Sequence, residues 1–150
     1  MRRKVIAPSV LAASLLLVIP ASAASAGPGA PGIGDSYYPA SGNGGYDVSH
    51  YDLRLQYQPK TDLLEGTATL LATAKQDLSR FNLDFGLKVS EIRVNGVKAK
   101  FATSGTQELE VTPAQPLQKG KEASVVVKYS GKPSEYKVDG WSAWQRTPDG

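Results

Sequence analysis

The chain carries few of the side chains from which metal centres and active sites are built. It has 150 residues, a single histidine, His50, and no cysteine. A zinc site needs three or four protein ligands, most often histidine and cysteine. Without companions, His50 is expected to be a surface residue or a cross-strand hydrogen-bonding residue. The sequence therefore excludes a His- or Cys-rich zinc site within these 150 residues.

Acidic residues offer a second possible chemistry, because Ca²⁺ binds carboxylate and carbonyl oxygens. Asp47, Asp52 and Asp84 might supply such oxygens, but their spacing matches no ordered calcium-binding loop. We expect them to be solvated carboxylates of strands and turns. A Ser-His-Asp triad is not supported either, since the chain has no G-x-S-x-G turn to present a nucleophile.

Large aromatic residues gather near the end of the chain and allow two interpretations. Tyr136, Trp141 and Trp144 could form a stacking platform for sugar rings, as on a carbohydrate-binding module. Large aromatics are equally common as core residues or as anchors of an interface. Trp141 and Trp144 are therefore candidate interface or stacking residues.

Strands are the elements expected to position these side chains. Polar residues alternate with Tyr51, Leu53, Leu55 and Tyr57, which is the period of a strand buried on one face. Asn95-Gly96 between apolar residues predicts a tight hairpin turn, because both central positions need positive φ. Strands are predicted at about 46–58, 63–75, 80–86, 88–95, 97–102, 108–112 and 122–130. The fold class is all-β: an antiparallel β-sandwich or saddle-like open sheet, incomplete at the C-terminal end.

The first residues have the organisation of an export signal. Positive residues 2–4 precede the largely apolar segment 5–19, and small residues ending at Ala23 and Ala26 fit the A-x-A cleavage pattern. A retained membrane anchor is the alternative, but a spanning helix needs about 20 apolar residues and Pro20 ends this run earlier. We expect a secreted protein, cleaved near Ala23 or Ala26, and favour general secretion over twin-arginine export.

The net positive charge of the chain comes from the residues of this signal. The chain has a formal net charge of +3 with 17 basic and 14 acidic residues. Residues 2–4 supply three of the basic ones, so the remaining 14 basic and 14 acidic residues cancel. The composition therefore supports no nucleic-acid partner and no stable membrane association.

Residues 46–150 also resemble a known family in an ordered series of short sequence motifs. These are Y-D-V-S-H-Y-D-L-R-L-Q-Y, L-L-E-G-T-A-T-L, L-D-F, L-K-V-S-E-I-R-V-N-G and the terminal G-W-S-A-W-Q-R-T-P-D-G. The series resembles the N-terminal part of secreted zinc aminopeptidases of the aminopeptidase N family, closest to the actinobacterial type. The resemblance implies a β scaffold at the N-terminus and a zinc-dependent catalytic domain in the polypeptide that follows.

The family's catalytic motifs are missing from this chain. It has neither the H-E-x-x-H zinc motif nor the G-x-M-E-N substrate loop, and its only methionine is Met1. The expected organisation is a signal over 1–26, a Gly/Pro-rich linker or docking arm over 27–45, and a truncated β domain over 46–150. Catalytic, metal and substrate-binding residues are expected to be absent from this chain, and the fragment to be inactive.

The partners implied by the resemblance are the missing catalytic domain of the same polypeptide and, for the full enzyme, peptide substrates and zinc. Trp141 and Trp144 would then pack where the scaffold meets the catalytic domain. The alternative is a stand-alone secreted β-sandwich binding module, for carbohydrate or for surface interaction. A purely structural surface domain is a third possibility.

Overall fold

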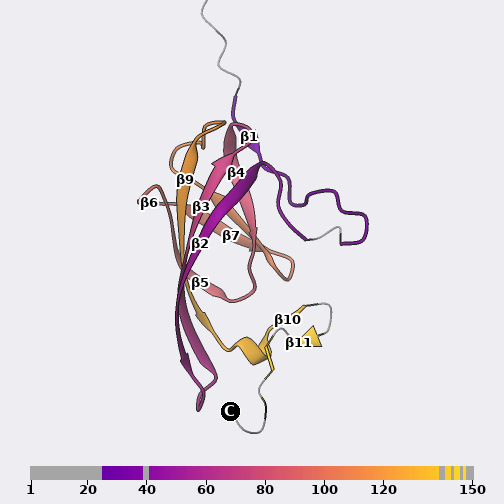
Figure 1. Ribbon diagram of the computed structural model, residues 1–150, viewed down its shortest axis with the longest axis vertical. Helices are drawn as coiled ribbons and strands as arrows, with labels where there is room; N and C mark the ends of the chain where they lie inside the picture. Colours follow the sequence, from indigo (N-terminus) through magenta and orange to yellow (C-terminus); the bar gives the residue numbers. More distant parts are fainter. Residues whose placement is uncertain (1–24, 39–40, 139–140, 143, 146, 148–150) are drawn as a thin grey trace, which may run out of the picture.

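The computed structural model describes residues 25–38, 41–138, 141, 142, 144, 145 and 147. The predicted export signal therefore lies almost entirely outside the described residues. Within them the secondary structure is almost purely β (Figure 1), with strands β1 Gly27–Pro28, β2 Tyr46–Gln58, β3 Leu63–Ala74, β4 Leu78–Asp84, β5 Lys88–Val94, β6 Val97–Lys98, β7 Lys100–Ser104, β8 Glu108–Thr112, β9 Glu122–Gly131, β10 Lys137–Val138 and β11 Trp141–Ser142.

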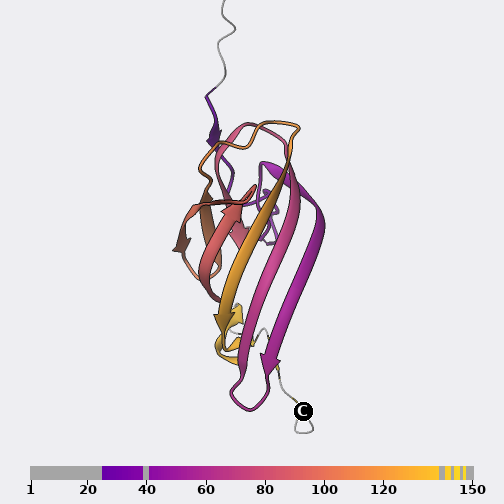
Figure 2. The same cartoon turned by 90° about the vertical axis from the view of Figure 1, so that its left-hand side faces the viewer.

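Two sheets form the body of the domain. The large sheet has five antiparallel strands in the order β2-β3-β9-β5-β6, with β2 at one edge (Figure 2). The small sheet has four strands in the order β1-β4-β8-β7, with β1 parallel to β4 and the others antiparallel. Neither sheet closes into a barrel, so the predicted all-β, antiparallel open-sheet architecture is confirmed.

The chain moves from the large sheet to the small sheet where one continuous strand was expected. The predicted strand over 97–102 is wrong in this respect: β6 pairs with β5, whereas β7 pairs with β8 in the other sheet. The change occurs at Ala99, whose N–H donates to the Ile92 carbonyl at 2.9 Å. The turn before it is as predicted, with φ of 50° at Asn95 and 79° at Gly96.

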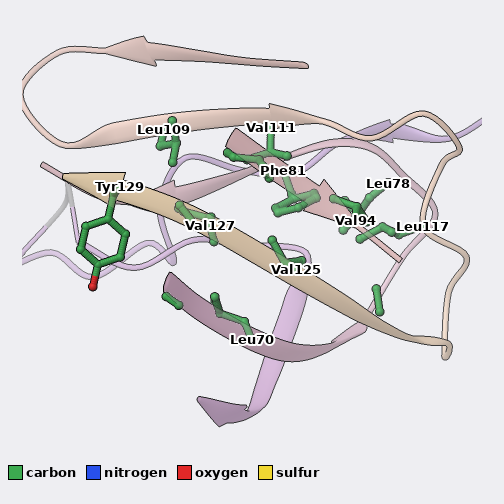
Figure 3. Packing of buried hydrophobic residues seen from close by; sticks show 14 of the residues in the cluster. Leu70, Leu78, Phe81, Val94, Leu109, Val111, Leu117, Val125, Val127 and Tyr129 are labelled. Carbon is green, nitrogen blue, oxygen red and sulfur yellow. The ribbon is translucent and has the colours of Figure 1, made fainter. Parts of the chain in front are cut away.

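The core fills the space between the two sheets (Figure 3). Apolar residues from the facing sides of both sheets are almost completely removed from water; the largest are Leu78, Phe81, Ile92, Leu109, Val111, Val125 and Val127. Burial of this kind contributes about 25 cal/mol per Å² of apolar surface. A domain without cysteine depends on this contribution, since it has no disulfide to hold it together.

Residues of the Gly/Pro-rich segment lie against the small sheet. The Gly29 N–H donates to the Arg80 carbonyl at 2.8 Å, which continues the pairing of β1 with β4. Further along the segment, Asp84 accepts hydrogen bonds from the Gly42 N–H at 2.8 Å and from Asn43 Nδ2 at 2.9 Å. The described part of this segment is thus attached at both of its ends.

After β9 the chain turns back towards the tip of the β2–β3 hairpin. Pro133–Glu135 form a 3₁₀ turn, η1, and the short hairpin β10–β11 follows (Figure 1). Asp62 in the β2–β3 turn accepts hydrogen bonds from the Ser134 hydroxyl and from Tyr57 Oη, the latter at 2.8 Å. No helix in the described residues is long and apolar enough to cross a membrane.

Candidate docking face

An exposed apolar strip lies on the inner side of β2. Tyr51, Leu53 and Leu55 are 58%, 58% and 53% exposed, although their alternation predicts burial. That prediction is wrong for these three residues, which we call the open face. The small sheet does not cover them, so the large sheet keeps an uncovered apolar strip along this strand.

The register of the β2–β3 hairpin shows where the core stops. Tyr51 is directly opposite Leu70, and Leu53 is opposite Ala68. Directly paired residues of an antiparallel sheet share one side, yet Leu70 and Ala68 are only 6% and 7% exposed. The boundary between the core and the open face therefore runs between two neighbouring strands.

Only the first residues of β2 are covered by the small sheet. Tyr46 packs edge-on against Phe81, with ring centroids 5.8 Å apart, and its hydroxyl donates to the Asn82 carbonyl at 2.7 Å. Burial raises the pKa of Tyr46 far above its usual value, and the nearby Tyr51, Asp84 and Glu108 raise it further. Tyr46 is thus a neutral structural residue, not a candidate acid or base.

A hollow of about 640 Å³ lies beside the open face. Its walls come from the large sheet, from β4 and from the N-terminal segment, and include Leu53, Leu70, Phe85, Tyr129 and Ile33. Such a volume is within the range of ligand or docking pockets, which are mostly apolar with a few polar groups. The hollow extends the apolar strip of β2 sideways.

Tightly packed aromatic rings support the floor of this hollow. Tyr129 contacts Phe85 edge-on, with centroids 4.8 Å apart. A Cβ placed on Gly66 would come within 2.4 Å of Tyr129 Cζ, so only glycine leaves room for the ring. Burial raises the pKa of Tyr129. A glycine inside a predicted strand is the one sequence signal that could have indicated this close approach.

Two of the aromatic residues near the end of the chain, Tyr136 and Trp144, have different contacts in the structure. Trp144 lies beside Tyr57 at the tip of the large sheet, with ring centroids 5.3 Å apart. Tyr136 instead packs on the backbone of Gly86, where a Cβ would come within 1.8 Å of its ring. Trp141 belongs to β11, and its side chain lies outside what the structure describes. The interface or stacking role of Trp141 and Trp144 stays a prediction.

The opposite side of the large sheet is polar. Glu91 forms ion pairs with Arg93 at 3.0 Å, Lys98 at 3.3 Å and Lys128 at 3.4 Å. The hydrogen bonds from Arg93 and then Lys98 lower the pKa of Glu91 to about 2, and Lys128 contributes in the same direction. This charged network distinguishes the outer side from the apolar inner side.

The candidate metal-binding residues do not come together. His50 is exposed on β2, Asp47 pairs with Lys75 at 3.0 Å, and Asp52 pairs with Arg54 at 3.3 Å. Asp84 holds the N-terminal segment, as described above. Among the residues that the structure describes, no group of three or more His, Cys, Asp or Glu side chains could hold a metal ion.

Solved structures of M1 zinc metallopeptidases are similar to this domain. The enzyme from Deinococcus radiodurans matches 68% of the chain with 36% identity and a TM-score of 0.61. A variant of that enzyme bound to a Tyr-Ser-Ala substrate has the same identity and coverage and a TM-score of 0.62. A two-domain M1 zinc metallopeptidase variant bound to L-arginine gives the same three values.

The match covers only part of those enzymes. The chain spans 24% of the length of each of these structures. No protein-family model matches the chain, and no curated protein matches it. The comparisons therefore relate this β domain to one portion of M1 zinc metallopeptidases.

Proposed function

We propose that this chain is the N-terminal β domain of a secreted zinc aminopeptidase of the M1 family and acts as a scaffold, not as the catalyst. The observation that carries the proposal is the 36% identity to M1 zinc metallopeptidases over 68% of the chain. The ordered motifs of 46–96, which resemble the family, form β2 to β5 and the following turn and are consistent with it.

The residues of this chain do not fit the zinc site of such an enzyme. Zinc in a catalytic site takes three protein ligands and a water. The chain offers one histidine, which is exposed, and Asp47 and Asp52 are each engaged by a basic side chain. We therefore assign the zinc and its ligands to polypeptide that this chain does not include, and derive no catalytic step from the residues present.

The contribution of this domain is a rigid wall with one apolar side left uncovered. The Leu53 and Leu55 side chains are more than half exposed, while the core behind them is closely packed. Exposed apolar strips of this kind mark interaction surfaces. In the proposed enzyme the open face receives other polypeptide of the same molecule, and the substrates of the whole enzyme are peptides, as the Tyr-Ser-Ala complex of a similar enzyme supports.

The experiment is an activity and metal assay on this chain together with the reading frame beyond Gly150. Purified chain with added zinc should not hydrolyse aminoacyl amides and should not retain stoichiometric zinc after dialysis. The downstream reading frame should encode H-E-x-x-H followed by a distant glutamate. Hydrolysis by this chain alone, or a downstream frame without that motif, would overturn the proposal.

A further inference from the structure

Asp62, at the end of the β2–β3 turn, has a backbone conformation that usually belongs to glycine. Its φ is 54°, and among the described residues the only other non-glycine residue with positive φ is Asn95, in the tight turn discussed above. Such a conformation is uncommon for residues with a side chain, although Asp and Asn adopt it more readily than others. Glycine would fit this position more easily, so the presence of an aspartate calls for a role of its carboxylate.

The Asp62 carboxylate joins two segments that are far apart in the sequence. Its Oδ1 accepts a hydrogen bond from Tyr57 Oη at 2.8 Å, within the hairpin. Its Oδ2 accepts hydrogen bonds from the Ser134 hydroxyl and from the Ser134 N–H, the latter at 3.3 Å and 72 residues further along the chain. Hydrogen bonds to a carboxylate are stronger than those between neutral groups. Asp62 thus ties the tip of the large sheet to η1.

The residues around and after η1 are held at further points. We call residues 132–138, 141, 142 and 144 the exit segment. Tyr136 lies on the backbone of Gly86, where a Cβ would come within 1.8 Å of its ring. The Ser142 hydroxyl donates to the Ser134 carbonyl at 3.4 Å, and β10 pairs with β11. The exit segment therefore folds back on itself beside the hairpin tip.

Trp144 approaches β2 from the side that carries the open face. Tyr57 follows Leu55 by two positions, so both side chains lie on the inner side of the strand. Leu55 is 53% exposed, whereas Tyr57 is partly buried and has Trp144 beside it, with ring centroids 5.3 Å apart. The exit segment thus contributes to the cover of the apolar strip at the tip of the sheet.

We propose that Asp62 is a positioning residue that holds the exit segment against the inner side of β2, so that the polypeptide following this segment starts beside the open face. This inference rests on the proposed function, in which other polypeptide of the same molecule docks on that face. A chain that is already held in place loses less conformational freedom on docking. Its effective concentration at the surface is also higher. Asp62 thereby favours docking within one molecule over docking between molecules.

Four substitutions separate this role of Asp62 from the shape of the turn. Asp62→Ala removes the carboxylate, and Asp62→Gly removes it while suiting the positive φ, so the hairpin should keep its fold. Ser134→Ala removes one donor, whereas Ser134→Thr keeps a hydroxyl. Glu135→Ala is the matched control, because it breaks the ion pair of Glu135 with Lys132 in the same turn, at 3.2 Å, and leaves the bonds of Asp62 intact.

The fluorescence of Trp144 reports whether the exit segment is held. In a Trp141→Phe background Trp144 is the only tryptophan, and quenching by acrylamide measures its accessibility. Each lost hydrogen bond should make the released segment at least about twofold more populated. Quenching should therefore increase in both Asp62 variants and in Ser134→Ala, but not in Ser134→Thr or Glu135→Ala.

A site-specific quencher tests the side on which the segment lies. The chain has no cysteine, so a nitroxide can be attached to Leu55→Cys on the inner side or to Gln56→Cys on the outer side. The label at Leu55→Cys should quench Trp144 more strongly than the label at Gln56→Cys. Asp62→Gly should reduce this difference, because the segment is then released.

The outcomes that overturn the proposal are specific. They are unchanged acrylamide quenching in both Asp62 variants, an equal increase in Glu135→Ala, an increase in Ser134→Thr as large as in Ser134→Ala, or equal nitroxide quenching from the two sides of β2. Circular dichroism checks that each variant is folded. All measurements use this chain alone, so their failure leaves the zinc and reading-frame test of the proposed function intact. Failure of that test would remove the docking polypeptide but not the contacts of Asp62.

Discussion

β2 and β3 are the two strands of one hairpin. They share an alternating sequence pattern, but they differ in whether its apolar residues are buried. Both alternate apolar and small or polar residues over 12 or more positions. Leu70 on β3 is 6% exposed, whereas Tyr51, directly opposite on β2, is 58% exposed. The local conformation is the same on both sides of the pair, so the difference comes from what lies above each strand.

The difference teaches that coverage by the second layer, not alternation, decides which strand contributes to the core. β3 lies inside the large sheet, between β2 and β9, and its inner side faces the small sheet. β2 lies at the edge; Tyr46 at its beginning packs against Phe81 of the small sheet, whereas Tyr51, Leu53 and Leu55 stay more than half exposed. The proposed docking of other polypeptide on the open face would account for the alternation of β2.

The largest effect is expected where the two sheets cover each other. Phe81→Ala removes a side chain that is 2% exposed and contacts Tyr46. The lost burial and the remaining cavity should lower the free energy of unfolding by about 3–5 kcal/mol. Urea denaturation followed by circular dichroism measures this change. A loss of unfolding free energy as small as that of a surface substitution would show that Phe81 does not belong to the core between the two sheets.

A smaller effect is expected on β3, where it meets the ring of Tyr129. Gly66→Ala introduces a Cβ within 2.4 Å of Tyr129 Cζ, so the ring must move and the free energy of unfolding should fall by about 1–3 kcal/mol. Gly27→Ala is the matched control, because an added Cβ there meets nothing within 4 Å. Equal effects of the two substitutions in denaturation experiments would contradict the packing described for the inner side.

The smallest effect concerns the outer, charged side of the large sheet. Folding lowers the pKa of Glu91 from 4.5 to about 2, so its ionised form stabilises the folded state. This contribution is complete above pH 4.5 and is lost as the pH falls towards 2. As the pH falls over that interval, the melting temperature of Glu91→Gln should therefore fall less than that of the unmodified chain. Thermal denaturation measures both. A pH profile identical to that of the unmodified chain would argue against the network.

The strands and the tight turn were predictable because they depend on local pattern. Alternation located β2, β3 and β9 to within one residue, and Asn95-Gly96 located the turn. The exchange between sheets at Ala99 was not predictable, because both β6 and β7 are compatible with one extended strand. The exposure of Leu53 was not predictable either, because the position of β2 at the edge of the sheet is a property of the whole fold. From the sequence, Trp144 was a candidate interface or stacking residue, which stays a prediction; its contact with Tyr57 required the structure.

The most direct test of the difference between β2 and β3 is the matched pair Leu53→Ala and Leu70→Ala. Both substitutions remove the same atoms from the same side of neighbouring strands, and their unfolding is compared by urea denaturation in dilute, monomeric solution. We expect Leu70→Ala to cost about 2–5 kcal/mol and Leu53→Ala about 1 kcal/mol or less. Equal costs for the two variants would contradict the account, because β2 would then belong to the core and would not be an open surface.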